Sequence, residues 1–473
     1  MFFRRRSALR PGSVRLGSRS NQCNKENQLM ARNQGYLVSY IAKLSEYCDV
    51  LLLKGAYHIG IDEIVRNIND GKINYINLAS PIVKSRIKDN PDAFVKHLDK
   101  RRINVLNNIQ CLPEIIQYLQ SLYSNLKSKG STSELKTIIG TCAEIPELED
   151  LNLLLAEKMF TSNLYPSSVA EATGYSANIL DKLYAKTLHR DVYARTRLHE
   201  MVKSATFVKF SPDNPDYFDE LLNLILNQNI GALYHLNSPS KAVKIMIGLA
   251  NYIGRETLHE RICMDTDLDD ITYPSYYQSI LDSFVGFELR PYSPPSENDS
   301  GDPPCDEDLE QEEYETRRFY FIDCNFLAYL KGKTINRRIF GDFILFYQIL
   351  TNFVISELKK ISSAQAGAEL WYIHRPDCEI DVMLTREGNN AIGFRIRGND
   401  QILEKDLKHF GVFRQIMGPR FKRGYVIYLG NEIRKLDEDV YALPISYLWS
   451  DYETRLGEFD DDQEASREDA QAV

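Results

Sequence analysis

The 473-residue sequence has no long uncharged apolar run and no closely spaced pairs of cysteine or histidine. The uncharged, largely apolar stretch 343–356 is shorter than the roughly 20 residues of a membrane span, so we expect a buried helix there and no membrane segment. Arginines 4–6 are followed by polar and small residues, not by the apolar core of a secretory signal. The eight cysteines form no CxxC pair, which predicts reduced thiols in the cytoplasm and no metal site.

The sequence also lacks a globally basic character, because its net charge of -9 is concentrated in three segments. Residues 1–20 hold six Arg and no acid, residues 293–316 hold ten acids and no base, and residues 458–473 hold seven acids and one Arg. The rest of the chain is therefore close to neutral, without the positive surface that nucleic acids require. This pattern favours a protein partner over a nucleic acid.

Three segments have too few large apolar residues to fold by themselves, namely 1–30, 293–316 and 453–473. We interpret them as an Arg-rich tail, an acidic linker and an acidic tail. The Arg-rich tail could contact nucleic acid or direct import, but a solvated tail is the commoner outcome. The acidic C-terminus is similar to the glutamate-rich signals of some type IV secretion substrates, with a solubilising tail as the favoured alternative.

Strand-like and helical patterns alternate in the first half of the chain and predict a parallel α/β sheet across 31–200. The predicted strands are 50–53, 73–78, 103–106 and 137–139, and the predicted helices are 61–68 and 115–126. Residues 201–292 then show helical periodicity at 221–226, 242–253 and 275–284 before a short strand at 285–291, which suggests a winged-helix module. Residues 317–452 form a separate α/β pattern, with strands at 370–373, 380–384, 391–396 and 424–429 and a helix at 403–413.

The stretch DVLLLKGAYHIGIDEIV resembles the Walker A region of the prokaryotic AAA-type ATPases that carry a nuclease-like C-terminal domain. It keeps Gly55 and Gly60, but the Lys and Ser/Thr that bind phosphate and magnesium are replaced by Ile61 and Asp62. Lys54 is the only basic side chain near the lost position. A plain strand-to-helix turn is favoured here over an anion-binding turn.

Further segments follow the family's order with the reactive residues changed. INVLNNIQCLPEIIQYL resembles the Walker B region, but Asn107 and Asn108 replace its acidic pair. TIIGTCAEIP resembles the next strand, and Glu157 and Lys158 stand where the family has Gly-Arg. The resemblance therefore implies a degenerate ATPase domain.

The C-terminal part resembles the same family more closely, through RRFYFIDCNFLAYLKG and ELWYIHRPDCEIDVML. This domain resembles the PD-(D/E)XK nucleases, a restriction-endonuclease-like α/β fold in which carboxylates hold a metal beside a catalytic Lys. Glu379 and Asp381 are retained, but Arg395 and Arg397 stand where Glu and Lys are needed. We interpret these four residues as a remnant nuclease site, with Asp381 paired to Arg395 or Arg397 instead of binding metal. The resemblance covers roughly residues 40–450.

Two functions remain open. The first is a non-catalytic pseudoenzyme that serves as a binding or scaffold protein and needs no cofactor. The second is an ATPase with rewired residues, which would bind ATP with magnesium through Gly55, Gly60 and Lys54. The winged-helix module is interpreted as a structural linker, because 275–284 contains no Lys or Arg to contact DNA. No catalytic residue is assigned, and the sequence specifies no oligomeric state.

Overall fold

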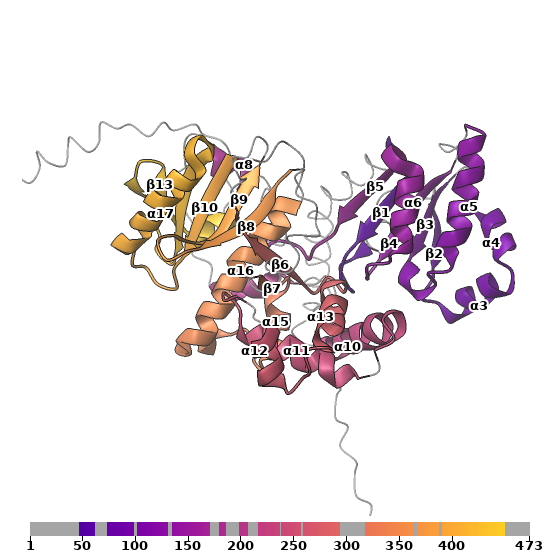
Figure 1. Ribbon diagram of the computed structural model, residues 1–473, viewed down its shortest axis with the longest axis horizontal. Helices are drawn as coiled ribbons and strands as arrows, with labels where there is room; N and C mark the ends of the chain where they lie inside the picture. Colours follow the sequence, from indigo (N-terminus) through magenta and orange to yellow (C-terminus); the bar gives the residue numbers. More distant parts are fainter. Residues whose placement is uncertain are drawn as a thin grey trace, which may run out of the picture.

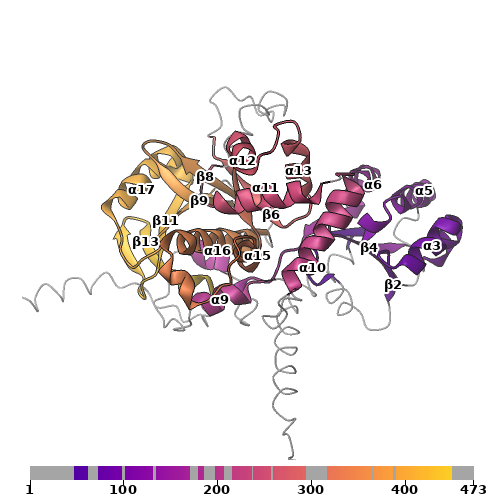
Figure 2. The same ribbon diagram turned by 90° about the horizontal axis from the view of Figure 1, so that it is seen from below.

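The computed structural model consists of two sheets joined by a helical segment (Figure 1). The N-terminal and C-terminal sheets lie at opposite ends of the molecule, and helices of residues 216–281 lie between them (Figure 2). The structure describes residues 47–61, 73–98, 102–130, 135–170, 179–185, 198–206, 216–236, 238–256, 259–293, 317–363, 367–386 and 390–449. The predicted tails 1–30 and 453–473 and most of the predicted helix 61–68 lie outside these ranges.

The N-terminal sheet has five parallel strands in the order β2-β3-β4-β1-β5. They are β1 (Val50–Lys54), β2 (Ile73–Asn77), β3 (Ile103–Asn107), β4 (Lys136–Thr141) and β5 (Met159–Asn163). The helical elements along this part are α3 (Pro81–Asp89), α4 (Pro91–His97), η1 (Ile109–Cys111), α5 (Ile115–Ser128), α6 (Glu147–Leu155) and η3 (Ala156–Lys158). The parallel α/β sheet predicted from the sequence is confirmed.

The central strand β1 is buried on both faces. Successive side chains of a strand point to opposite faces, so Val50 and Leu52 pack with α5 and α6 on one side. Leu51 and Leu53 pack with Ile59 on the other side. A strand covered on both faces needs a continuous apolar run, which the sequence of β1 supplies.

The helical segment contains α8 (Ile179–Tyr184), α9 (Leu198–Ser204), α10 (Tyr217–Leu224), a π-helix η4 (Ile225–Leu233), α11 (Pro239–Asn251), α12 (His259–Thr266) and α13 (Tyr273–Leu281). Helix α12 was missed from the sequence, because only Ile262, Cys263 and Thr266 of its eight residues are buried. The strand predicted at 285–291 is present as β6 (Gly286–Pro291).

The C-terminal sheet has eight strands in the order β12-β13-β11-β10-β9-β8-β6-β7. Apart from β6 they are β7 (Arg318–Phe321), β8 (Glu369–His374), β9 (Glu379–Arg386), β10 (Asn390–Ile396), β11 (Phe421–Tyr428), β12 (Arg434–Asp437) and β13 (Val440–Pro444). Their helical elements are α15 (Cys324–Leu330), η6 (Arg337–Gly341), α16 (Phe343–Ser363), α17 (Glu404–Met417), η8 (Gly418–Arg420) and η9 (Ile445–Trp449).

Helix α16 contains the uncharged stretch 343–356 and is mostly buried, as predicted. No helix within the described ranges combines the length and apolar character needed to cross a bilayer.

The predicted winged-helix and C-terminal units share one structural body. Strand β6 follows α13 in the chain. It pairs antiparallel with β7 and parallel with β8, so it belongs to the C-terminal sheet. One continuous apolar core joins Leu249 of α11 and Ile280 of α13 to Phe353 of α16. The strand that pairs with β7 therefore comes from the predicted winged-helix module, 201–292.

A connector from the N-terminal half also docks on the C-terminal sheet. The Val169 backbone N–H donates to the Glu357 Oε2 atom of α16 at 2.7 Å, and the Tyr425 hydroxyl donates to the Leu183 carbonyl at 2.7 Å. Arg386 forms an ion pair with Asp181 of α8 at 2.6 Å. Helix α8 thus packs on the C-terminal sheet, although it lies within the predicted 31–200 unit (Figure 1).

Candidate functional site

The turn that follows β1 requires both of its glycines. A Cβ on Gly55 would lie 2.7 Å from the Leu164 carbonyl oxygen and 2.8 Å from the Ile59 Cδ1 atom. Gly60 has a φ of 91°, a backbone conformation that residues with a Cβ rarely adopt. Steric fit and backbone conformation alone therefore account for these two residues, without a bound anion.

The basic and apolar side chains at this turn are both engaged. The Lys54 Nζ atom forms an ion pair with the Glu144 Oε2 atom at 2.6 Å, in the loop that follows β4. Ile61 is buried, and its Cγ2 atom lies 3.1 Å from the position of a Cβ on Gly140 of β4. Ile61 therefore packs against the end of β4, where the resemblance places the phosphate-binding Lys. Asp62 lies outside the described residues.

Amide side chains fill the carboxyl ends of β2 and β3. The Asn107 Nδ2 atom donates to the Tyr75 hydroxyl at 3.1 Å, and its Oδ1 atom accepts from the Asn108 backbone N–H at 2.9 Å. Asn108, at a φ of 59°, donates through Nδ2 to the Asn77 Oδ1 atom at 3.0 Å. Asparagine tolerates this left-handed conformation better than most residues. These neutral groups satisfy one another where the family has a magnesium-binding acidic pair.

Tyr57 closes the same region against the helical segment. Its hydroxyl donates to the Asn229 Oδ1 atom of η4 at 2.8 Å and accepts from the Gln110 Nε2 atom at 3.5 Å. Asn229 donates in turn to the Cys142 carbonyl at 2.8 Å. Burial raises the pKa of the Tyr57 phenol well above its usual value, so the hydroxyl remains a donor at neutral pH. We call this set, Tyr57, Asn77, Asn107, Asn108, Gln110 and Asn229, the amide network.

The space left beside the amide network is small. A cavity of about 230 Å³ lies along the turn and is bordered by Tyr57, His58, Asn107 and Asn108. Ligand pockets in proteins usually measure roughly 300–1,000 Å³. A larger cavity of about 690 Å³ lies between the sheet and η4, lined by the acids Glu114, Glu144 and Glu147 and the bases Lys84 and His235. Its acidic lining opposes a nucleotide triphosphate.

The four residues of the remnant nuclease site belong to one ion-pair cluster, because Asp406 of α17 lies within ion-pair distance of both Arg395, at 3.8 Å, and Arg397. The Arg395 guanidinium, 5% exposed, contacts the Asp381 Oδ1 atom at 2.9 Å and the Glu379 Oε2 atom at 3.0 Å. Arg397 pairs instead with Asp406 of α17, with Nε 2.9 Å from Oδ2. The predicted ion pair of Asp381 is thus present, and Arg395 is the partner.

Both oxygens of Asp381 are occupied. The Oδ2 atom accepts from the Ile396 backbone N–H at 2.7 Å, while Oδ1 contacts Arg395. Burial alone would raise the pKa of Glu379, but the adjacent Arg395 guanidinium holds it below its usual value. A cation already neutralises these carboxylates, so the residues do not fit a magnesium ion.

Sequence reasoning missed the residues that complete these sites. Tyr57 and Asn229 lie 172 positions apart, and no local pattern connects them. Asp406 was placed in a predicted helix and given no role, although it forms an ion pair with Arg397. The buried pair Glu357 and Lys360, 2.9 Å apart on α16, was also not singled out. Charged residues inside an apolar helix were the available signal for that pair.

Comparison with known proteins identifies a domain of unknown function, DUF4143, at residues 348–448. No curated protein matches the chain. Among solved structures, the chain aligns with AMPPCP-bound DnaA from Aquifex aeolicus at 12% identity, covering 52% of this chain and 86% of that chain with a TM-score of 0.24.

Two further alignments involve other ATPases. A STAND-type signal transduction ATPase with a tetratricopeptide repeat sensor from Pyrococcus horikoshii aligns at 13% identity, covering 70% of this chain and 47% of that chain with a TM-score of 0.20. RuvB of Thermotoga maritima aligns at 12% identity, covering 57% of this chain and 89% of that chain with a TM-score of 0.22. Likenesses this low assign no ligand or activity. The chain thus combines a five-stranded parallel α/β sheet with a C-terminal part that contains a DUF4143 domain.

Proposed function

We propose that this chain is a non-catalytic binding or scaffold protein built on an ATPase-like domain and a nuclease-like domain. The observation that carries this proposal is the hydrogen bond of 2.8 Å between Tyr57 in the turn and Asn229 in η4. It ties the turn to the helical segment across the region where a nucleotide would have to enter. Opening the site would leave the buried Asn229 amide without this partner, which costs free energy.

Electrostatics support the same proposal. A triphosphate requires cations, and the sequence of the turn from 55 to 63 contains no Lys or Arg. Lys54 is neutralised by Glu144 at 2.6 Å. A phosphate would have to displace this carboxylate and then face the other acids of the larger cavity, Glu114 and Glu147.

The ion pairs of the nuclease-like site also support a binding role instead of catalysis. Arg395 supplies a permanent positive charge beside Asp381 and Glu379, so the cluster is stable without metal. A guanidinium is not deprotonated at neutral pH and cannot assist an attacking water as Lys does. We therefore propose that this domain serves as a rigid surface, and that the partner is a protein in the cytoplasm.

The second candidate is a rewired ATPase. The observation that favours it is the position of Lys54 at the end of β1, directly before Gly55. If Glu144 released it, this ammonium group would be the one available to replace the family's phosphate-binding Lys.

Calorimetric titration of ATP with magnesium into the full chain separates the two candidates. We expect no saturable heat up to millimolar nucleotide in the wild type, in Lys54→Ala or in Glu144→Gln, which frees Lys54. Saturable binding that Lys54→Ala removes and Glu144→Gln strengthens would overturn the scaffold proposal. If the scaffold proposal is correct and nucleotide plays no role, pull-downs with the wild type and with Lys54→Ala should recover the same protein partner.

The acidic C-terminus carries a further proposal, export through a type IV secretion system. Deleting residues 458–473 from a reporter fusion should abolish translocation if this segment is the signal. Unchanged translocation, or none in the wild type, would leave it as a solubilising tail.

A further inference from the structure

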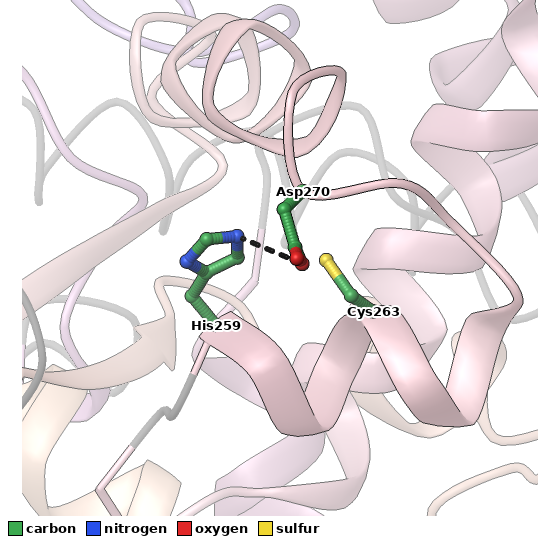
Figure 3. A group of neighbouring side chains, drawn as sticks. All are labelled: His259, Cys263 and Asp270. Carbon is green, nitrogen blue, oxygen red and sulfur yellow. Dashed lines mark ion pairs between the residues drawn. The ribbon is translucent and has the colours of Figure 1, made fainter.

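Three potential metal ligands converge on the helical segment, away from both sites described above. Figure 3 shows the side chains of His259 and Cys263 on α12 and of Asp270 in the loop that follows, directed toward one another. One ligand atom from each residue lies within 4.8 Å of the other two. A nitrogen, a sulfur and a carboxylate oxygen are therefore within reach of a single ion.

The local fold builds this arrangement. His259 and Cys263 are four residues apart on α12 and so lie on the same face of the helix. Asp267 has a φ of 54° and reverses the chain at the end of α12, and the Leu268 backbone N–H donates to the Cys263 carbonyl at 3.0 Å. This reversal returns Asp270 to the side of α12 that carries the other two residues.

Neighbouring contacts hold the loop and the imidazole in place. Asp269 accepts from the Thr272 backbone N–H at 2.7 Å and pairs with Lys241 at 3.4 Å. The His259 ring stacks on Tyr273, with centroids 4.8 Å apart and an interplanar angle of 20°. These contacts orient the ligands before any ion binds, which lowers the entropic cost of binding.

The chemistry of the cluster is incomplete without a cation. The His259 Nε2 atom is buried and has no hydrogen-bond partner among the described residues, and it lies 3.5 Å from the Asp270 Oδ1 atom. Cys263 is 4% exposed, and its Sγ atom lies within 4.8 Å of the ligand atoms of His259 and Asp270. A nitrogen without a hydrogen-bond partner among the described residues and a buried sulfur thus both lie near the Asp270 carboxylate.

We propose that His259, Cys263 and Asp270 bind a divalent transition-metal ion, with zinc the best match to this ligand set. Zinc takes His nitrogen, Cys sulfur and carboxylate oxygen in tetrahedral geometry, and three protein ligands leave the fourth position for water or a partner. From the usual bond lengths, ligand atoms around zinc stand roughly 3.3–3.8 Å apart, so the side chains need to close by at most about 1 Å. The thiol proton passes to solvent when the metal binds.

Bound zinc would link α12 to the loop before α13. Because α11, α12 and α13 share the core of the C-terminal sheet, such a link would stabilise the helical segment. This inference is independent of nucleotide binding and holds whether the scaffold or the ATPase proposal is correct.

The test uses the full chain, stripped with a chelator and titrated with zinc against a chromophoric competitor. We expect one equivalent in the wild type, and at least a tenfold weaker affinity in His259→Ala and Cys263→Ser. Cys111→Ser, which changes a thiol outside this cluster, is the matched control and should bind as the wild type does. Cobalt substitution should give a thiolate-to-cobalt charge-transfer band that Cys263→Ser removes.

His259→Ala keeps the test valid if Cys263→Ser fails to fold, because the His259 side chain is 40% exposed. Circular dichroism would establish that each variant is folded. Equal zinc affinity in the wild type and in folded His259→Ala would overturn the proposal. A charge-transfer band retained in Cys263→Ser would do the same, because the sulfur ligand would then lie elsewhere.

Discussion

At the scale of single residues, Arg395 determines the chemistry of the C-terminal acidic cluster. It is buried on β10 and contacts Asp381 and Glu379 at 2.9 and 3.0 Å. Taking these charges out of water is costly, and the cost is recovered only while the guanidinium remains. The same residue therefore holds the two acids in an ion-pair cluster and stabilises the sheet.

Arg395→Ala should lower the free energy of unfolding by about 3–5 kcal/mol, because it leaves two carboxylates close together without a counterion. Urea denaturation followed by circular dichroism measures this loss. The control is Arg375→Ala, which removes an exposed ion pair with Asp377 between β8 and β9. It should lower the free energy of unfolding by less than about 1 kcal/mol. Similar losses in both variants would mean that the Arg395 cluster contributes no more than a surface pair.

Asp282 should make stability depend on pH. Burial and the nearby Glu144 carboxylate raise its pKa to about 6 in the folded protein, from an ordinary value of 3.8. Between these values the unfolded chain has lost the proton and the folded chain retains it, so stability falls as pH rises through this window. The full shift corresponds to about 3 kcal/mol, and solvent screening of this half-exposed group reduces it to roughly 1–2 kcal/mol.

Asp282→Asn should therefore be more stable than the wild type by roughly 1–2 kcal/mol above about pH 7. The two proteins should converge below about pH 3, where the carboxyl is protonated in both states. Thermal unfolding across this range measures the difference. A difference that is constant with pH would assign the effect to altered hydrogen bonds with Tyr234 and Gln278 instead of to ionisation.

At the scale of elements, the turn after β1 is determined by close packing. Gly55 touches the backbone that follows β5, and Gly60 reverses the chain before Ile61. Both requirements come from close packing and backbone conformation at the end of β1. The two glycines are therefore explained without a bound nucleotide.

Gly55→Ala should lower the free energy of unfolding by about 1–3 kcal/mol, because the added methyl overlaps the Leu164 carbonyl. Gly411→Ala on α17 is the matched control. Its Cβ meets nothing within 4 Å and should raise stability by about 0.5–1 kcal/mol through helix propensity. Chemical denaturation of both variants gives the comparison, and a neutral Gly55→Ala would contradict the close approach.

At the scale of the whole molecule, the C-terminal sheet includes a strand that precedes residue 317, the predicted start of the C-terminal domain. Strand β7 pairs only with β6 in the sheet order, and β6 lies before the acidic segment 293–316. Glu357, fully buried on α16, accepts the Val169 backbone N–H and contacts Lys360 at 2.9 Å. Segments that precede residue 317 therefore supply a strand and a connector to the C-terminal sheet.

A fragment of residues 317–452 should not fold cooperatively, because β7 loses its partner strand and Glu357 loses its backbone donor. A fragment of residues 164–452, which includes the connector and β6, should unfold cooperatively near the midpoint of the full chain. Circular dichroism with thermal unfolding compares them. Equal midpoints for the two fragments would show that 317–452 is an independent domain.

Much of the fold could be predicted because local patterns of apolar residues and glycines indicate its strands and turns. The run at Val50 to Leu53 followed by Gly55 indicated a buried parallel strand and its turn, and the structure contains both. The polar helix α12 and the π-helix η4 were not recognised, because their register is set by packing against neighbours. Propensity is a weak guide where tertiary contacts decide.

The sequence by itself determined which chemical groups are available: no Lys or Ser/Thr in the turn, Asn107 and Asn108 at the end of β3, and Arg395 beside the acids. Residue identity is a local property, so losses of this kind can be read directly. Only the tertiary structure decided the partners, joining Tyr57 to Asn229 and Arg395, not Arg397, to Asp381. Such pairings depend on how distant strands and helices pack, because a hydrogen bond or ion pair forms only where the fold brings two groups within a few ångströms of each other.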